Sequence, residues 1–312
     1  MVASLTGKRF QKKKGFSLSK DLLFYVAILA FPVVQFIIFY VVVNFNSVLL
    51  AFKKYTFVTN VGYVQSWCGF DNFARVWDEL TKSSILRDAL VNSIYVWAIS
   101  TFLGTFLAAI FSFYISNHRF LGKFFKFALF LPSVLPTILL TSMFTFFANQ
   151  AIPGYLSAWF NQNLQPLLMD AHTRFWCILF YSVWIGFGGQ VLLYSGALGQ
   201  MNPAVVEAAE LDGASSGKIF LHIALPHLMP TIGTFLISGV AGLFVSQANL
   251  YNFFGMNAEY SDSTIGYYLF RLVNGSVNSY ADYPYAAALG LCCTCLAIPL
   301  TMIVRKIVKR WE

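Results

Sequence analysis

Six long apolar runs, separated by shorter polar segments, dominate the chain. Each is long enough for an α-helix to cross a hydrocarbon core of about 30 Å, which takes roughly 20 residues. The pattern therefore predicts an all-α polytopic membrane protein with six transmembrane helices. The expected spans are residues 22–43, 89–115, 124–147, 175–198, 229–253 and 283–304.

Composition agrees with this class. The chain has 312 residues, of which 58% are hydrophobic and 11% charged, and its mean hydropathy is +0.65. These values lie far from those of a water-soluble globular domain. The expected organisation is a basic tail (1–21), a first transmembrane anchor (22–43), an extracytoplasmic loop (44–88), a core with the other five spans (89–304) and a second basic tail (305–312).

The distribution of Lys and Arg predicts the orientation in the membrane, because positive residues in short loops stay on the cytoplasmic side. Basic residues are concentrated in both tails and beside the turn between the second and third spans, which places both termini and residues 202–230 in the cytoplasm. The net charge of +8 is explained by contact with anionic lipid and indicates no nucleic-acid partner. The basic residues of this face are Lys8, Arg9, Lys12, Lys13, Lys14, Lys20, Arg119, Lys123, Lys126, Lys218, Arg305, Lys306, Lys309 and Arg310.

The stretch 202–230 is a long passage of mixed polarity between two apolar runs. Asn202 is a good helix N-cap and Pro203 a good first helical residue, because proline has no N–H to lose there. Gly213 predicts the helix end, since glycine enters a left-handed turn without penalty. Ser215 or Ser216 is expected to cap a second short helix through Ile223, which Pro226 stops or kinks.

Two spans carry small residues at intervals of four, which let helix backbones approach closely. We expect both stripes to pack inside the bundle. They are Gly104, Ala108 and Ser112 in the second span and Ser238, Gly242 and Ser246 in the fifth. Pro132 and Pro136 predict a bend or break in the third span.

The loop before the second span is expected to contain a short amphipathic helix. Gly69 and Asp71 suggest the turn that leads into it, and Phe73, Val76 and Trp77 are expected to point inward.

Catalytic and nucleotide-binding patterns are missing from the sequence. The five cysteines and four histidines form no metal or disulfide pattern. None of the Gly-Lys pairs completes the G-x-x-x-x-G-K-[ST] phosphate cradle, so any ATP must be bound by another chain. An ion-coupled transporter would show carboxylates buried in its spans. A membrane enzyme would show a cluster of acidic and histidine residues, and a channel would show a selectivity filter. The sequence shows none of these patterns.

The sequence from Glu207 reads E-A-A-x-x-D-G-A, and Phe220, Ile223, Leu225, Pro226 and Pro230 follow. This resembles the EAA loop in permease subunits of bacterial binding-protein-dependent ABC importers. GFDNF, ALVNS, LPSVLP and TIGYYLF elsewhere in the chain resemble the maltose-type carbohydrate permeases, and the first of their two permeases in particular.

The resemblance implies a type I importer fold in the bacterial cytoplasmic membrane, with alternating access driven by other subunits. Implied partners are a second homologous permease, an ABC ATPase dimer that binds ATP and magnesium, and an extracytoplasmic solute-binding protein. The coupling residues implied on this chain are Glu207, Ala208, Ala209, Asp212, Gly213, Ala214 and Pro226. Glu207 would make the polar contact to the ATPase, and no catalytic residue, metal or cofactor is expected here.

Uncharged polar residues inside apolar spans are costly unless they pair or face a cavity. The candidates for contact with a hydroxyl-rich solute are Gln190, Tyr194, Ser246, Gln247, Asn249 and Asn252, and hydrogen bonding between helices is the alternative. A carbohydrate is the expected cargo. Glycerol phosphate in the same machinery and, more remotely, ion-coupled transport are the alternatives.

Overall fold

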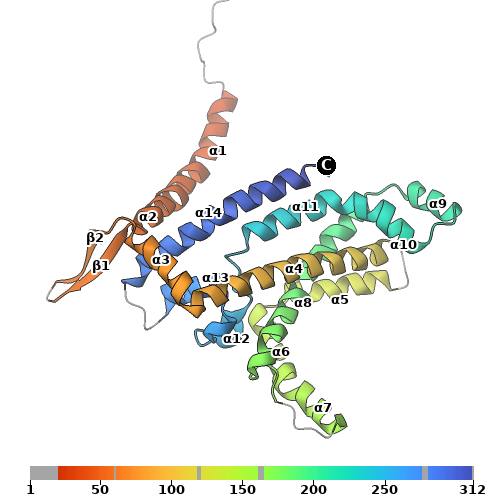
Figure 1. Ribbon diagram of the computed structural model, residues 1–312. Helices are drawn as coiled ribbons and strands as arrows, with labels where there is room; N and C mark the ends of the chain where they lie inside the picture. The colour runs from red at the N-terminus through yellow and green to blue at the C-terminus, as the bar shows by residue number, and fades with distance from the viewer. Residues whose placement is uncertain (1–19, 60, 118–120, 161–164, 276–279, 311–312) are drawn as a thin grey trace, which may run out of the picture. The chain divides into compact units, whose positions relative to one another are not determined.

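The computed structural model describes residues 20–59, 61–117, 121–160, 165–275 and 280–310 (Figure 1). The chain divides into two units, residues 1–49 and 50–312. The described part of the first unit is one continuous helix, whose side chains from Phe24 to Val48 are exposed, and it extends beyond the end at Val43 that the sequence predicted. Its segments are α1 (Lys20–Phe36), a π-helical stretch η1 (Ile37–Val42) and α2 (Val43–Leu50).

The second unit contains the remaining spans. Four of its helices are long and apolar enough to cross a membrane, and a bent pair of helices forms one more candidate span. Together with the helix of the first unit, the described residues contain up to six candidate spans. These spans are built mainly on α4 (Ser84–Ser116), α5 (Gly122–Val134), α6 (Thr137–Phe146), α8 (Ala171–Leu198), α11 (Leu225–Ala241) and α14 (Asp282–Val308). The other α-helices described in this unit are α3 (Asp71–Lys82), α7 (Ile152–Phe160), α9 (Pro203–Leu211), α10 (Ser216–Ile219), α12 (Leu250–Phe254) and α13 (Ile265–Asn274).

Helix α8 is the centre of the second unit, because it packs against α4, α5 and α11. Small residues permit the close approach. Ser112 on α4 donates a hydrogen bond to the Val191 carbonyl at 3.0 Å, and Gly188 lies directly against the backbone of α5. Ala108 and Ser112 are fully buried, so the predicted packing role of the stripe on the second span is confirmed.

The third span is broken, as its two prolines predicted. Pro132 lies inside α5 and Pro136 caps α6, and the helices on the two sides of the break differ in direction by 102°. Helix α6 continues through a π-helical turn η2 (Phe147–Ala151) into α7. The physical cause is local, because proline supplies no N–H to the helical ladder and restricts the residue before it.

The fifth span differs from the expectation at both ends. It begins at Ser216, where α10 passes through a π-helical turn η3 (Phe220–Ala224) into α11 without interruption, and it ends at Ala241. The predicted start of the second helix at Ser216 is confirmed. Its predicted end near Ile223 and a stop at Pro226 are wrong, and of the two expected effects of Pro226 only a local distortion remains. Pro226 lies in the first turn of α11, and the wider π-helical turn before it accommodates a residue that has no backbone N–H.

The segment before α4 contains a feature that the sequence did not predict. Strands β1 (Lys53–Val58) and β2 (Gly62–Trp67) form an antiparallel hairpin, in which Tyr55 pairs with Gln65. The amphipathic helix α3 follows and buries Val76, as expected. Trp77 is 67% exposed, so its inward assignment is wrong. It follows Val76 directly and so points away from the buried stripe.

We predict that Gly188→Ala destabilises the contact between α5 and α8. A Cβ atom there would lie 2.2 Å from the Leu129 carbonyl oxygen, and overpacking of this kind costs about 1–3 kcal/mol. Thermal unfolding in detergent should occur at a lower temperature than in wild type. Gly189→Ala is the matched control, because nothing lies within 4 Å of the position that its methyl group would take. Equal midpoints for the two variants would contradict the prediction.

Candidate functional site

The loop between α8 and α11 begins as its sequence predicted. The Asn202 side chain accepts a hydrogen bond from the Ala204 N–H at 3.1 Å, and Pro203 is the first residue of α9. Asp212 is the C-cap, and Gly213 has a φ of +76°. Since only glycine enters this left-handed region without a steric penalty, Gly213 fixes the turn between α9 and α10.

Helix α9 presents an exposed surface at one tip of the second unit (Figure 1). None of its residues is buried. Glu207 and Ala208 are exposed and Ala209 is half-buried, while Leu211 has 89% of its surface exposed. After α9, Ala214 is half-buried and Pro226 is exposed. A carboxylate beside small and exposed apolar side chains is suited to contact with another protein.

The base of this loop is tied firmly to the bundle. Ile219, Ala224 and Leu228 are buried, and the last two belong to the apolar cluster that also contains Leu198 of α8. The ring of His227 makes a hydrogen bond with the Ala197 carbonyl through Nε2, at 3.2 Å. This bond joins the beginning of α11 to the end of α8, the two helices on either side of the loop.

A polar hollow lies between α4, α8 and α11, and we call it the central hollow. One region, which we call the outer region, lies beside residues 242–252 and has a volume of about 530 Å³. The other, which we call the inner region, lies beside Gln190 and Phe235 and has a volume of about 230 Å³. The two regions share Ser100, Thr101, Ser182 and Gly239. Among the described residues, every side chain that lines either region is uncharged.

Several polar atoms around the central hollow have no protein partner. Trp97 Nε1, Ser100 Oγ and Gln190 Oε1 are buried and make no hydrogen bond with any described residue. Buried polar groups are nearly always hydrogen-bonded in folded proteins. These three groups are an N–H donor, a hydroxyl and a carbonyl acceptor that lie buried beside the hollow.

The outer region of the central hollow is walled by residues 242–252, which we call the wall segment. Within it, Ala248 and Asn249 have φ values of 49° and 59°, a strained conformation for residues that are not glycine. Ser182 of α8 holds the strained pair, because its hydroxyl donates to the Ala248 carbonyl and accepts from the Asn249 amide, both at 3.4 Å. The fifth span is thus interrupted where it meets the hollow.

Of the six residues that the sequence suggested for contact with solute, five line the central hollow and one does not. Gln190 lines the inner region of the hollow. Four others, Ser246, Gln247, Asn249 and Asn252, line the outer region. Tyr194 does not line it, because its side chain is fully buried and packs edge-on against Phe235.

Two details of the sequence assignment are corrected. Ser246, Gln247 and Asn249 lie in the irregular part of the wall segment, and Asn252 lies in α12, so none of the four is inside a continuous span. The stripe Ser238, Gly242 and Ser246 lines the hollow instead of packing against another helix. Sequence reasoning also missed Trp97, Ser100, Thr101 and Ser182. For Ser100, Thr101 and Ser182 the sequence did carry a signal, because they are hydroxyl residues inside two apolar spans. Trp97 carried no such signal.

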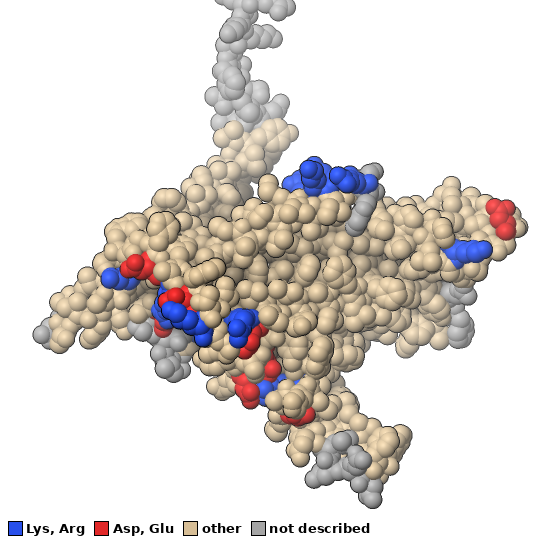
Figure 2. Space-filling model, viewed as in Figure 1, with Lys and Arg blue, Asp and Glu red and all other residues tan. Residues whose placement is uncertain are grey.

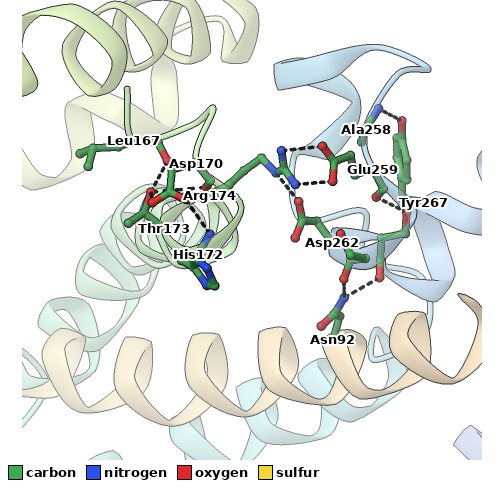
Figure 3. A network of polar contacts seen from close by, with 12 residues as sticks. Asn92, Leu167, Asp170, His172, Thr173, Arg174, Ala258, Glu259, Asp262 and Tyr267 are labelled. Atoms are coloured by element: carbon green, nitrogen blue, oxygen red, sulfur yellow. Dashed lines mark hydrogen bonds and ion pairs between the residues drawn. The ribbon is translucent and has the colours of Figure 1, made fainter. Parts of the chain in front are cut away.

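A group of three charges, two of them buried, lies at the opposite end of α8 from α9, and sequence reasoning missed it (Figure 3). Arg174 forms ion pairs with Asp262 and Glu259, and we call these three residues the Arg174 cluster. The Arg174 and Asp262 side chains are 8% and 7% exposed. Burial raises the pKa of the Asp262 carboxyl, although the guanidinium beside it acts to lower that pKa.

Comparison with known proteins decides the family. Residues 100–312 match the family described as binding-protein-dependent transport system inner membrane component. The chain belongs to this family. It is therefore an inner-membrane, multi-pass permease, with the type I importer fold that the sequence predicted.

Individual relatives agree with this membership. The permease is 22% identical over 283 residues to the multiple sugar-binding transport system permease protein MsmF of Streptococcus mutans, and the match covers 90% of this chain and 93% of that one. It is 28% identical to the probable ABC transporter permease protein MG188 homolog of Mycoplasma pneumoniae, over 68% of this chain and 65% of the relative.

A solved structure shares the fold. It is a bacterial alginate ABC transporter in complex with an alginate pentasaccharide-bound periplasmic protein, and one of its chains matches with a TM-score of 0.77 at 19% identity. The match covers 94% of this permease and 96% of that chain.

We predict that a cysteine at position 246 reacts with a small water-soluble thiol reagent, because Ser246 is exposed and lines the hollow. Ser112→Cys is the matched control, since Ser112 is fully buried between α4 and α8. Both variants are made after replacement of the five native cysteines, and the isolated chain is labelled in detergent. Mass spectrometry should show modification at position 246 many times faster than at position 112. Equal rates would contradict the assigned hollow.

Proposed function

We propose that this permease is one of two membrane subunits of an ATP-driven importer that moves an uncharged carbohydrate into the cell. The observation that carries the proposal is the uncharged, polar central hollow lined by α8 and α11, the two helices that flank the exposed α9. A sugar importer among the relatives and the fold shared with an alginate importer support carbohydrate as the cargo.

The charge of the hollow supports an uncharged solute. Its described lining residues carry no charge, whereas a phosphate or carboxylate group that leaves water is stabilised most strongly by a paired cation. Glycerol phosphate and acidic saccharides are therefore less suitable than a neutral sugar. Trp97, Ser100 and Gln190 would exchange hydrogen bonds with its hydroxyl groups.

The exposed surface of α9 supports a separate ATPase subunit as the motor. Glu207 offers a charged contact that can be oriented, and the small side chains beside it keep the helix surface flat. The proposed assembly contains a second homologous permease, an ATPase dimer with ATP and magnesium, and an extracytoplasmic solute-binding protein. The solute-binding protein in the alginate complex supports the last of these partners.

The distribution of charge supports the orientation with the α9 end and the C-terminus in the cytoplasm. The last turn of α14 carries Arg305 and Lys306, and Lys218 lies beside α9. Figure 2 shows a broad uncharged surface between charged groups near the ends of the second unit. An uncharged belt of this kind is expected of a surface that faces lipid. The N-terminal basic tail lies outside the described residues.

We predict that Glu207→Lys reduces uptake at least tenfold in the complete transporter, because the changed charge opposes the contact with the ATPase. Stimulation of ATP hydrolysis by the loaded binding protein should fall with it. Glu210→Lys is the matched control on the same exposed helix and should have a smaller effect. Normal uptake and normal stimulated hydrolysis in Glu207→Lys would refute the coupling role.

We predict that Gln190→Leu lowers solute uptake about three- to tenfold, which corresponds to one lost hydrogen bond of about 1 kcal/mol. Co-purification with the ATPase should be unchanged, since Gln190 lies away from α9. Thr294→Val is the control, because Thr294 lies on α14 beside an apolar groove outside the hollow. Uptake equal to wild type would remove Gln190 from the path. The cargo itself is identified by testing which saccharide stabilises the binding protein against heat.

A further inference from the structure

The Arg174 cluster joins α8 to a segment distant in sequence. Arg174 Nε donates to Asp262, and its two terminal nitrogens lie 3.0 and 2.8 Å from the two carboxylate oxygens of Glu259. This two-pronged geometry matches the planar fork of a guanidinium, which lysine does not reproduce. Removing one member of a buried ion pair leaves an uncompensated charge and is strongly unfavourable.

The same segment is also held from α4 (Figure 3). The Asn92 side-chain amide donates to the carbonyls of Ser261 and Ser263, at 2.6 and 3.1 Å. The Ser93 hydroxyl accepts from the Ile265 N–H at 2.8 Å. Two long helices therefore fix residues 259–265 at the end of the second unit opposite to α9.

Residues 259–265 in turn fix the wall segment of the central hollow. The Thr264 hydroxyl donates to the Ser246 carbonyl at 2.7 Å. Gly266 follows, and a Cβ atom there would lie 2.4 Å from the Val245 carbonyl oxygen. The position of the wall segment thus depends on residues 259–265, which the Arg174 cluster holds from α8 and Asn92 and Ser93 hold from α4.

Helix α8 connects this arrangement to the opposite end of the second unit. At about 1.5 Å per residue, its course from Arg174 to Leu198 spans about 36 Å. Its far end continues into α9, and its middle contributes Ser182 and Gln190 to the hollow. Helix α8 therefore leads into the exposed α9 at one end, contacts the wall segment through Ser182 and carries the Arg174 cluster at its other end.

We infer that Arg174 is a positioning residue that keeps the wall segment attached to α8 throughout the transport cycle, so that movement of α8 carries one wall of the hollow with it. The inference rests on the proposed function, because the transport cycle it refers to is that of the proposed ATP-driven importer. Its chemical basis is the buried guanidinium, which stays paired with both carboxylates in every state.

The test measures the distance between α8 and residues 259–265 in the complete transporter. Spin labels replace His172 and Ser261, both exposed, after replacement of the five native cysteines. Electron paramagnetic resonance then gives the distance without nucleotide and in an ATP-trapped state. We expect one narrow distance that is the same in both states. A distance that changes between states in the otherwise wild-type chain would overturn the inference.

The variant Arg174→Met should broaden this distance distribution and lower solute uptake at least tenfold, while the ATPase still co-purifies. Arg174→Lys should restore only some of the uptake. Arg75→Met is the matched control, because Arg75 also pairs with carboxylates but lies half exposed on α3, outside the hollow. A narrow distance and normal uptake in Arg174→Met would equally overturn the inference.

If Arg174→Met fails to assemble, Glu259→Gln keeps the buried pair with Asp262 and removes one charge from a side chain that is 61% exposed. It should broaden the distance to a smaller degree, and an unchanged distribution would count against the inference. The distance measurement requires no carbohydrate. Failure of the wild-type transporter to take up any sugar would therefore refute the proposed function and leave this test intact.

Discussion

The need to satisfy backbone polar groups inside an apolar bundle organises this permease. The fifth span ends at Ala241 and its chain continues irregularly to Leu250, so carbonyl and N–H groups leave the helical ladder. Lipid offers them no partner, and irregular backbone is tolerated only where protein or a cavity surrounds it. Here backbone turns pair some of these groups, and the hydroxyl groups of Ser182 and Thr264 donate to the Ala248 and Ser246 carbonyls. The break and the central hollow are thus two consequences of one constraint.

Local features of the chain could be predicted from its sequence, because their causes act within a few residues. Asn202 caps α9 and Gly213 ends it through a side-chain hydrogen bond and a left-handed φ, both available to the isolated segment. Pro132 and Pro136 break the third span for an equally local reason. The motif that begins at Glu207 identified the family by the same kind of short-range pattern.

Features that depend on contacts between distant residues could not be predicted. Arg174 is 85 residues from Glu259 and 88 from Asp262, and each looked like a loop or helix-end charge in the sequence. The end of the fifth span was misplaced because apolar residues continue past Gly242 while their backbone does not remain helical. Tyr194 resembled a solute contact by its type and position, yet neighbouring aromatic and aliphatic side chains enclose it.

The division of charge within the permease follows from what a transport path requires. Among the described residues, the ion pairs lie at the end of the second unit opposite to α9, where Arg75 and Arg174 join segments that are distant in sequence. The central hollow has only uncharged donors and acceptors among its described residues. In the proposed transport of a sugar, each of these would exchange a hydrogen bond with a solute hydroxyl at a net free energy of about 1 kcal/mol, because water offers the solute a comparable bond. Such contacts can orient a sugar during passage, and each is weak enough that a modest movement of α8 or α11 releases it.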